Sequence, residues 1–312
     1  MTDHMTALLE LAREAAAPEG LTSKGLTARF GRPEAADPSA GQVWRARWEE
    51  DSLLVLVLGV RGAQVEVAPI TIEPTGQDDR SVVVSAEATA FGVDTTAWCG
   101  LRGELPFRVL DRVVDEWSAE ITRCVVDQAP SATSVRRGRR VPEDEEVRYD
   151  IAATMDRLGC VPAFAVPRPD GPPLRDLRKV VSLPLAAIRE CLGVSQSEAM
   201  DIMRARKPLA ADQVQLLADR AGVTAASIDE CLPGLPALEI DEVEHPRWRG
   251  LLAYLARTNG RTEADTRLRV AHGAFALAAR QSGQGDGGAG LWRQRIQRYL
   301  DAELPAGAPG DY

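Results

Sequence analysis

The sequence is poor in lysine, histidine and cysteine, and each shortage excludes a class of protein or site. Only Lys24, Lys179 and Lys207 are lysines among 37 basic residues, and 46 acidic residues bring the formal charge to −9. This balance excludes a polybasic, histone-like chain but not a local basic patch, because net charge averages over the chain. The five scattered cysteines form no Cys-x-x-Cys pair, and the chain has three histidines. We therefore expect no disulfide framework, no metal site and no cofactor.

Long apolar runs are also missing. No run approaches the roughly 18 residues of a membrane-spanning helix, and the first twenty residues do not resemble a secretory signal. We therefore expect a cytoplasmic protein that does not contact a membrane. With 312 residues, of which 45% are hydrophobic, the chain is long enough for two or three domains with their own cores.

The N-terminal part of the chain changes from a helical to a strand-like pattern. Residues 5–17 have apolar side chains at helical spacing, and a Pro/Gly/Ala connector occupies residues 31–41. Short alternating or β-branched stretches, divided by Gly and Pro, follow at residues 43–48, 53–58, 64–68 and 82–84. This spacing is typical of a small β-barrel. Residues 105–126 are predicted to be helical, with Leu110, Val113, Val114, Trp117 and Ile121 on one side.

A polar segment at residues 128–148 is predicted to be a linker. It carries a basic block at residues 136–140, directly followed by acidic residues 143–146. We interpret it as a solvated segment that neutralises itself, and a basic arm on a phosphate backbone is the alternative. A second, Pro-rich connector spans residues 162–173.

The stretch from residue 174 to residue 228 predicts four short helices and carries the strongest motif. Leu185, Ile188 and Leu192 form the apolar stripe of the second helix, which Pro184 opens. Gly193 is placed to end that helix in the left-handed conformation. Ser195 and Glu198 have the spacing of a capping box at the start of the third helix. The expected inward side chains of the third and fourth helices are Ala199, Ile202, Met203, Val214, Leu217 and Ala218.

A helix, a glycine turn and a capped helix in this order are what helix-turn-helix DNA binding requires. The N-terminal residues of the second helix of such a pair face base edges in the major groove. We therefore expect Gln196, Ser197 and Asp201 to contact bases. Phosphate contacts are expected from Arg178, Lys179, Arg204, Arg206 and Lys207. Residues 174–209 contain seven basic and four acidic side chains, an excess of three positive charges within an acidic chain.

This segment resembles the Cro/XRE-type, phage-repressor-like helix-turn-helix family over residues 174–228. The resemblance rests on the sequence Leu-Gly-Val-Ser-Gln-Ser at 192–197, the exit Arg-Ala-Arg-Lys-Pro at 204–208 and Leu-Ala-Asp-Arg-Ala-Gly-Val at 217–223. The chain departs from the family at Ala205, where Gly is usual, and Asp201 places a negative charge at a base-reading position. The resemblance implies binding of double-stranded DNA and transcription regulation.

Residues 41–117 show a weaker resemblance to the MazF/PemK-like toxin barrels, which are small endoribonucleases. The similar stretches are residues 41–44, 53–58, 67–71 and 95–102, with residues 106–115 in the place of the closing helix. The family uses a threonine, matched by Thr71, and an arginine before the second strand, whose place is held by Glu49-Glu50-Asp51-Ser52. Substitutes for that arginine would have to be Arg45, Arg47, Arg61 or Arg102. We therefore expect a catalytically degenerate barrel that serves dimerisation or binding.

Three more helices are predicted near the C-terminus, at residues 246–258, 262–281 and 291–304, with a flexible loop at residues 283–290. Thr262 is the expected N-cap of the middle helix. Arg293, Arg295 and Arg298 are expected on the outer surface of the last helix. His272 is expected to be a packed or surface histidine rather than a ligand or a base.

Taken together, these patterns predict an α+β multi-domain protein with a small N-terminal β-barrel, a central helix-turn-helix domain and a C-terminal helical bundle. The expected domains are 1–40 (helix and connector), 41–127 (barrel), 128–173 (linker with a short helix), 174–236 (helix-turn-helix) and 237–312 (dimerisation or effector helices). The predicted function is a DNA-binding transcriptional regulator, acting as a homodimer and responding to a protein partner or small effector. The alternatives are a MazF-like ribonuclease fused to its own repressor domain, as in a toxin–antitoxin locus, and an interaction scaffold without DNA binding.

Overall fold

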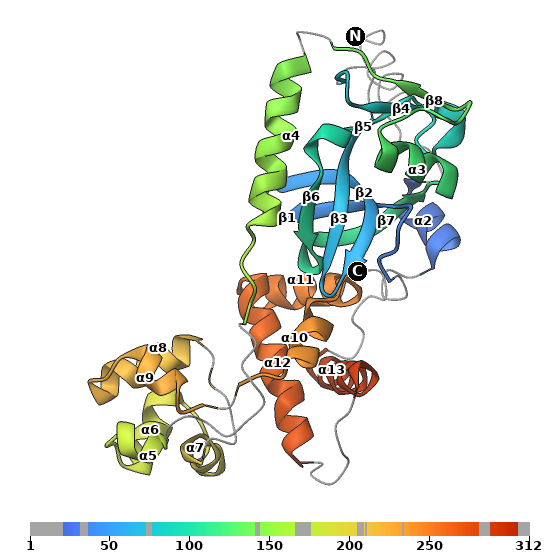
Figure 1. The fold of residues 1–312 in the computed structure, drawn as a ribbon. Helices are drawn as coiled ribbons and strands as arrows, with labels where there is room; N and C mark the ends of the chain where they lie inside the picture. Colours follow the sequence, from blue (N-terminus) through green and yellow to red (C-terminus); the bar gives the residue numbers. More distant parts are fainter. Residues whose placement is uncertain are drawn as a thin grey trace, which may run out of the picture. The chain divides into compact units, whose positions relative to one another are not determined.

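The computed structural model divides the chain into two compact units, Met1–Val161 and Pro162–Tyr312. It describes residues 21–31, 37–72, 77–140, 144–165, 176–204, 209, 211–232, 234–280 and 288–304. The helix predicted at residues 5–17, the first five residues of the loop predicted at 283–290, and Arg206 and Lys207 lie outside these residues. The class prediction is confirmed, since an antiparallel sheet in the first unit is followed by helices in the second (Figure 1).

The first unit is built on an antiparallel sheet whose described part has eight strands of different lengths. They are β1 (Gln42–Trp48), β2 (Asp51–Arg61), β3 (Gln64–Thr71), β4 (Val82–Val84), β5 (Thr95–Ala97), β6 (Gly103–Pro106), β7 (Leu110–Glu116) and β8 (Val135–Arg137). The strand order is β7-β1-β2-β3-β5-β4-β8, and β6 pairs with β3 beside that path. No pairing among the described residues joins β7 to β8, so the sheet is open there rather than a closed barrel.

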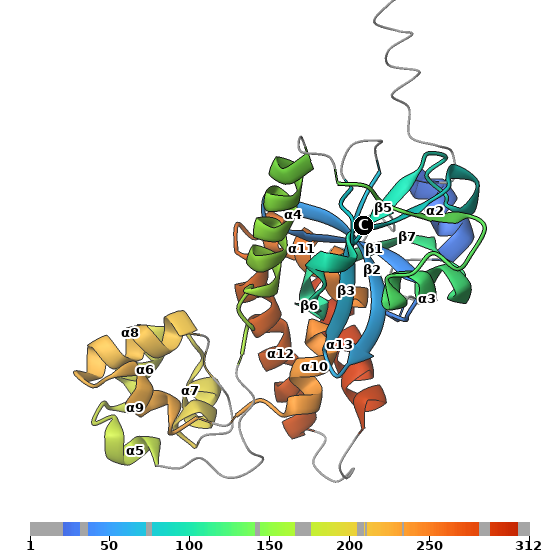
Figure 2. The ribbon, with the colours of Figure 1, turned by 45° about the horizontal axis from the view of Figure 1, so that its top comes forward.

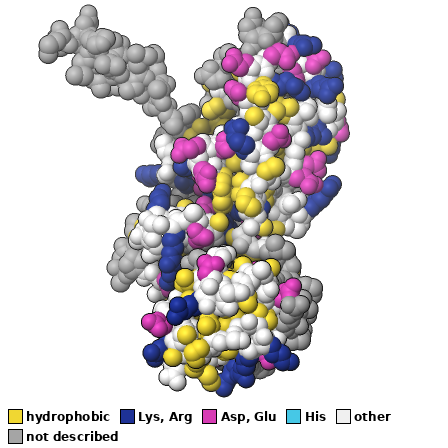
Figure 3. All heavy atoms as spheres, turned by 90° about the vertical axis from the view of Figure 1, so that its left-hand side faces the viewer, with side chains coloured by type: hydrophobic (Ala, Val, Ile, Leu, Met, Phe, Trp, Pro, Cys, Tyr) yellow, Lys and Arg dark blue, Asp and Glu magenta, His cyan; other side chains and the backbone are white. Residues whose placement is uncertain are grey.

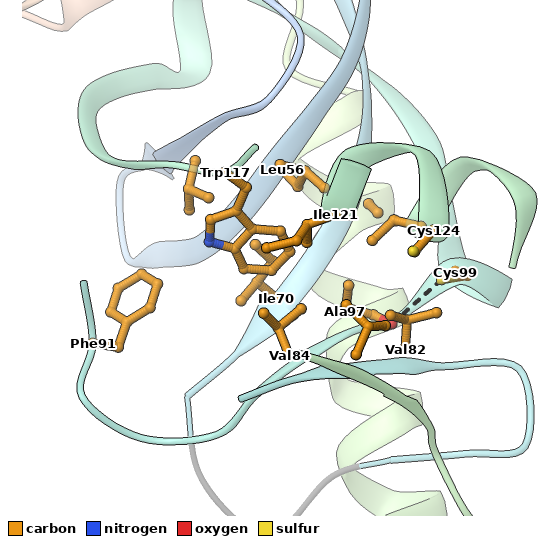
Figure 4. Close-up of a cluster of buried hydrophobic side chains, with 14 of the residues drawn as sticks. Leu56, Ile70, Val82, Val84, Phe91, Ala97, Cys99, Trp117, Ile121 and Cys124 are labelled. Carbon is orange, nitrogen blue, oxygen red and sulfur yellow. Dashed lines mark hydrogen bonds between the residues drawn. The ribbon is translucent and has the colours of Figure 1, made fainter. Parts of the chain in front are cut away.

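Both faces of this sheet are covered, because side chains alternate along each strand. On β1, Val43 points into one buried cluster and Trp44 into the other. The first cluster is completed by α2 (Ser23–Phe30) and α3 (Ala119–Asp127), and Figure 4 shows Ile121 and Cys124 of α3 gathered with strand side chains such as Leu56 and Ile70. The second cluster is completed by α4 (Asp144–Gly159). Figures 1 and 2 show α4 and α3 on opposite sides of the sheet.

The helix predicted over residues 105–126 is wrong for its first two thirds. Residues 110–116 form strand β7, which pairs with β1 from Gln42 to Ala46, and the helix α3 begins only at Ala119. The resemblance to MazF/PemK-like barrels fails at the same place, because residues 106–115 are not a closing helix. The apolar spacing in this stretch suits both structures, and the pairing with β1, 60 or more residues away in the chain, decides in favour of the strand.

The segment predicted as a linker at 128–148 is largely ordered. Val135–Arg137 forms β8 and pairs with β4, and α4 begins at Asp144. The positive charge of the basic block is partly neutralised within the segment, as expected, because Arg140 pairs with Glu145 at 2.6 Å. Arg136 makes a contact outside the segment, a hydrogen bond to Gln77 at 3.2 Å. The helix α2, which Thr22 caps by accepting from the Gly25 N–H at 3.1 Å, was not predicted.

The second unit is helical in its described part and contains two buried clusters. The first is formed by α5 (Leu177–Val180), α6 (Leu185–Leu192), α7 (Gln196–Met203), α8 (Ala211–Ala221) and α9 (Ala225–Asp229). The second is formed by α10 (Ala237–Glu244), α11 (Arg249–Thr258), α12 (Glu263–Arg280) and α13 (Ala289–Glu303). Five helices replace the four predicted for residues 174–228, and α10 was not predicted.

The three predicted C-terminal helices correspond to α11, α12 and α13. The prediction that Arg295 lies on the outer surface of the last helix is wrong. Thr262 does act as a cap, since its hydroxyl accepts from the Asp265 N–H at 3.1 Å. Arg295, however, is only 8% exposed, and its guanidinium lies 4.7 Å from the ring centre of Trp292. A long aliphatic stem and a planar head allow arginine to be buried against an aromatic ring, which a simple polar-face assignment overlooks.

Candidate nucleic-acid interface

The turn between α6 and α7 has the local geometry that the sequence predicts. Gly193 has φ 63°, and its N–H bonds back to the Arg189 carbonyl, which ends α6. The side chain of Ser195 accepts from the Glu198 N–H at 3.2 Å, and the Glu198 carboxylate accepts from the Ser195 N–H at 3.0 Å. This capping box begins α7 at Gln196 and is confirmed. Pro184 is the N-cap of α6 rather than its first helical residue.

Helix α7 has one buried and one solvent-facing side. Ala199 and Ile202 are both 0% exposed and pack with Ile188 of α6. Successive residues of a helix are about 100° apart, so the opposite side carries residues 197, 200, 201 and 204, and residue 196 lies at its edge in the first turn. Gln196 and Ser197 are exposed, and Asp201 is half-buried. The structure therefore places Ser197 and Asp201 on the side of α7 away from the core, with Gln196 exposed beside them in the first turn.

Three of the predicted phosphate-contacting residues are described by the structure, and all three are exposed. Arg204 is the C-cap of α7 and is exposed, as are Arg178 and Lys179 on α5. Across the described residues of this segment, four basic side chains meet four acidic ones, so the excess of three positive charges depends on Arg175, Arg206 and Lys207. Two of the acidic side chains are engaged at helix starts: Asp176 accepts from the Arg178 N–H of α5, and Glu198 accepts from the N–H of the N-cap residue Ser195.

Two residues of this region were missed by the sequence prediction. Arg189 is exposed on α6, where it adds a cation beside the pair of helices. Met200 is half-buried on the outer face of α7, one helical turn after Gln196. The signal for Met200 was the helical spacing itself, since residue 200 is four positions from residue 196 and four from Arg204.

Thr71, the residue that matches the threonine of the MazF/PemK-like ribonucleases, has a different environment from the one that the family resemblance implies. The hydroxyl of Thr71 accepts a hydrogen bond from the indole N–H of Trp98 at 3.1 Å, and Trp98 is fully buried. Three of the four candidate substitute arginines are bonded elsewhere: Arg45 to Asp111, Arg61 to Glu104 and Arg102 to the carbonyl groups at the end of α3. Thr71 is therefore positioned by a tryptophan in this structure.

The place of the missing arginine, before β2, is held by an engaged carboxylate. Arg157 of α4 donates to both oxygens of Asp51, with distances of 2.7 and 3.0 Å from its two nitrogens. This hydrogen bonding holds the pKa of Asp51 below its ordinary value. The guanidinium at this point is engaged by the Asp51 carboxylate, so it is not directed at a phosphate whose transition state it could stabilise.

Two hollows lie in the first unit. One of about 270 Å³ is lined by charged residues, including Asp78, Asp144 and Arg148. The other, of about 520 Å³, lies between the β6 region and α4 and is lined by residues such as Leu101, Met155 and Cys160. Its volume is in the range of small-molecule sites.

The described residues offer no group of three or more His, Cys, Asp and Glu side chains that would hold a metal ion. The five cysteines are free, and His272 is half-buried on α12. No helix in the described ranges is long and apolar enough to cross a membrane. No protein-family model matches the chain, and no curated protein is similar to it, so its function has to be argued from its own residues.

Proposed function

We propose that the protein is a DNA-binding transcriptional regulator that reads double-stranded DNA with helix α7. The observation that carries this proposal is the capped helix α7 behind the left-handed Gly193, with Gln196, Ser197 and Asp201 on its solvent-facing side. The glutamine amide matches the N6 and N7 edge of adenine, the serine hydroxyl can serve as donor or acceptor, and the aspartate accepts from cytosine N4. The arrangement agrees with the resemblance of residues 174–228 to Cro/XRE-type domains.

The phosphate contacts in this proposal come from Arg178, Lys179, Arg204, Arg206 and Lys207. One such helix reads a short site, so we propose a homodimer on two half-sites about one helical turn apart. The first unit, whose strands show the weaker resemblance to MazF/PemK-like barrels, then serves dimerisation or the binding of a partner or effector. The hollow between β6 and α4 is the place in that unit for a small effector.

A gel-shift experiment with the DNA upstream of the protein's own coding sequence tests the proposal. We expect salt-sensitive binding that Gln196→Ala weakens about tenfold, the loss of one good base contact, and that Arg204→Ala also weakens. Gln215→Ala and Arg220→Ala are the matched controls, because both residues are exposed on a different helix, α8. Equal effects of the α7 and α8 variants, or no binding at low salt, would contradict the proposal.

In this proposal the first unit does not cleave RNA. The expected arginine is replaced by the Asp51–Arg157 pair, and the hydroxyl of Thr71 accepts from Trp98. We therefore expect single-stranded RNA to stay intact when it is incubated with the purified protein and analysed on a denaturing gel. Cleavage that disappears in Thr71→Ala would instead establish the ribonuclease alternative.

A further inference from the structure

The outer face of α7 carries one apolar side chain that the core does not use. Two methionines occur on this helix, and they differ in their surroundings. Met203 packs against the buried cluster formed by Ile188, Ala199 and Ile202, whereas Met200 is not among the apolar residues that contact this cluster in the described part of the chain. Met200 is nevertheless half-buried rather than fully exposed. A thioether on a solvent-facing helix side is a flexible apolar surface available for contact.

The neighbours of Met200 show what that surface would meet. Gln196 precedes it by one turn and Arg204 follows it by one turn on the same face. Four residues of a helix rise about 6 Å, and successive base pairs are about 3.4 Å apart. When Gln196 reads a base, Met200 therefore lies over a base pair one or two steps away.

Only one group in the major groove is apolar, the 5-methyl group of thymine. From the position of Met200 between Gln196 and Arg204, we propose that Met200 selects thymine by packing its side chain against this methyl group. The inference rests on the proposed DNA binding and assigns to it a specificity-determining residue outside the polar set Gln196, Ser197 and Asp201. The operator half-site then has a thymine one or two base pairs from the base that Gln196 contacts.

Replacing thymine by uracil tests this inference, because uracil pairs identically and lacks only the methyl group. The full-length protein first selects its site from a random pool of duplex DNA. Each thymine of the selected site is then replaced in turn, and dissociation constants are measured for the wild type and Met200→Ala. We expect one thymine at which uracil weakens wild-type binding about fourfold, the value of burying one methyl-sized group, and at which Met200→Ala no longer distinguishes the two bases.

The controls separate a lost contact from a damaged domain. Met200→Leu, which keeps an apolar side chain, is expected to retain the uracil effect, and so is Met203→Ala, which removes a methionine from the inner side of the same helix. Selected DNA whose uracil effects are the same in wild type and Met200→Ala would overturn the inference and leave the proposed function standing. Failure to select any DNA would overturn the proposed function, and the inference with it.

Discussion

Glu239 on α10 shows how far one residue can depart from its usual chemistry. The residue is 0% exposed, and neither carboxylate oxygen has a hydrogen-bond partner among the residues that the structure describes. Burial raises the pKa of Glu239 to about 9, with the guanidinium of Arg295 acting in the opposite direction. The carboxyl group is therefore protonated at neutral pH, because the cost of burying an unpaired charge exceeds that of keeping the proton.

This raised pKa predicts a pH-dependent stability. Between the ordinary value of 4.5 and about 9, the unfolded chain releases the proton of Glu239 and the folded chain keeps it. The free energy of unfolding therefore falls as the pH rises, by up to about 1.4 kcal/mol per pH unit. Glutamine is neutral at every pH, so Glu239→Gln removes this pH dependence. The free energy of unfolding of Glu239→Gln relative to the wild type should therefore increase from pH 5 to pH 8, as measured by urea unfolding followed by tryptophan fluorescence. Glu146→Gln, at an exposed position of α4, is the control and should show no such trend.

At the scale of elements, helix ends are fixed by a few local residues. Two glycines differ in the backbone conformation that their positions require. Gly193 ends α6 with φ 63°, whereas Gly290 lies within the first turn of α13. An added Cβ atom would meet nothing within 4 Å at either position. Any difference between substitutions at these sites therefore comes from backbone conformation rather than from steric contact.

Gly193→Ala is expected to destabilise the α6–α7 turn by about 1 kcal/mol, because an L-residue is strained in the left-handed region. Gly290→Ala should have the opposite sign and stabilise α13 by about 0.5 kcal/mol, through the lower entropy of the unfolded chain. Hydrogen exchange measured by mass spectrometry, on peptides covering each helix, reports the two effects separately. Gly193→Asn should lose less stability than Gly193→Ala, since asparagine tolerates this conformation. Stability changes of the same sign for Gly193→Ala and Gly290→Ala would refute the conformational explanation.

These helix ends also show what could be predicted from the sequence. The Gly193 cap and the Ser195–Glu198 capping box involve residues no more than four or five positions apart, so their spacing was sufficient. Strand β7 was predicted as a helix because its apolar residues suit either structure, and only its pairing with β1 distinguishes them. Gln196 and Ser197 are exposed on α7, and the base contacts predicted for them stay a prediction. Met200 was not predicted as an outer residue, since an apolar residue on a predicted helix is ordinarily assigned to the core.

At the scale of the whole molecule, the distribution of charge matters more than its sum. The chain carries −9 in total, and on the face drawn in Figure 3 basic and acidic side chains are interspersed. An acidic background opposes nonspecific attraction to phosphates. The proposed DNA contacts therefore depend on a few basic residues near α7 rather than on a general positive field.

A salt titration of DNA binding measures how many of these residues act. If Arg178, Lys179, Arg204, Arg206 and Lys207 each neutralise one phosphate, the logarithm of the association constant should fall with the logarithm of salt concentration with a slope of about −4.5 per protomer. Arg204→Ala should reduce the magnitude of this slope by about one, and the exposed control Arg220→Ala should leave it unchanged. An unchanged slope in Arg204→Ala would show that Arg204 does not contact a phosphate.

The sequence by itself determined the α+β class, the principal strands of the sheet from β1 to β4, and the capped turn before α7. These features depend on periodicity and on residues close together in the chain. Only the tertiary structure decided that residues 110–116 are a strand, that Arg295 is buried on Trp292, and that Asp51 is held by Arg157. The strand and the Asp51 pair depend on partners from other elements, β1 and α4. The burial of Arg295 depends on how α13 packs into the cluster of α10 to α13, although Trp292 lies on the same helix. Local propensity and spacing do not identify such packing.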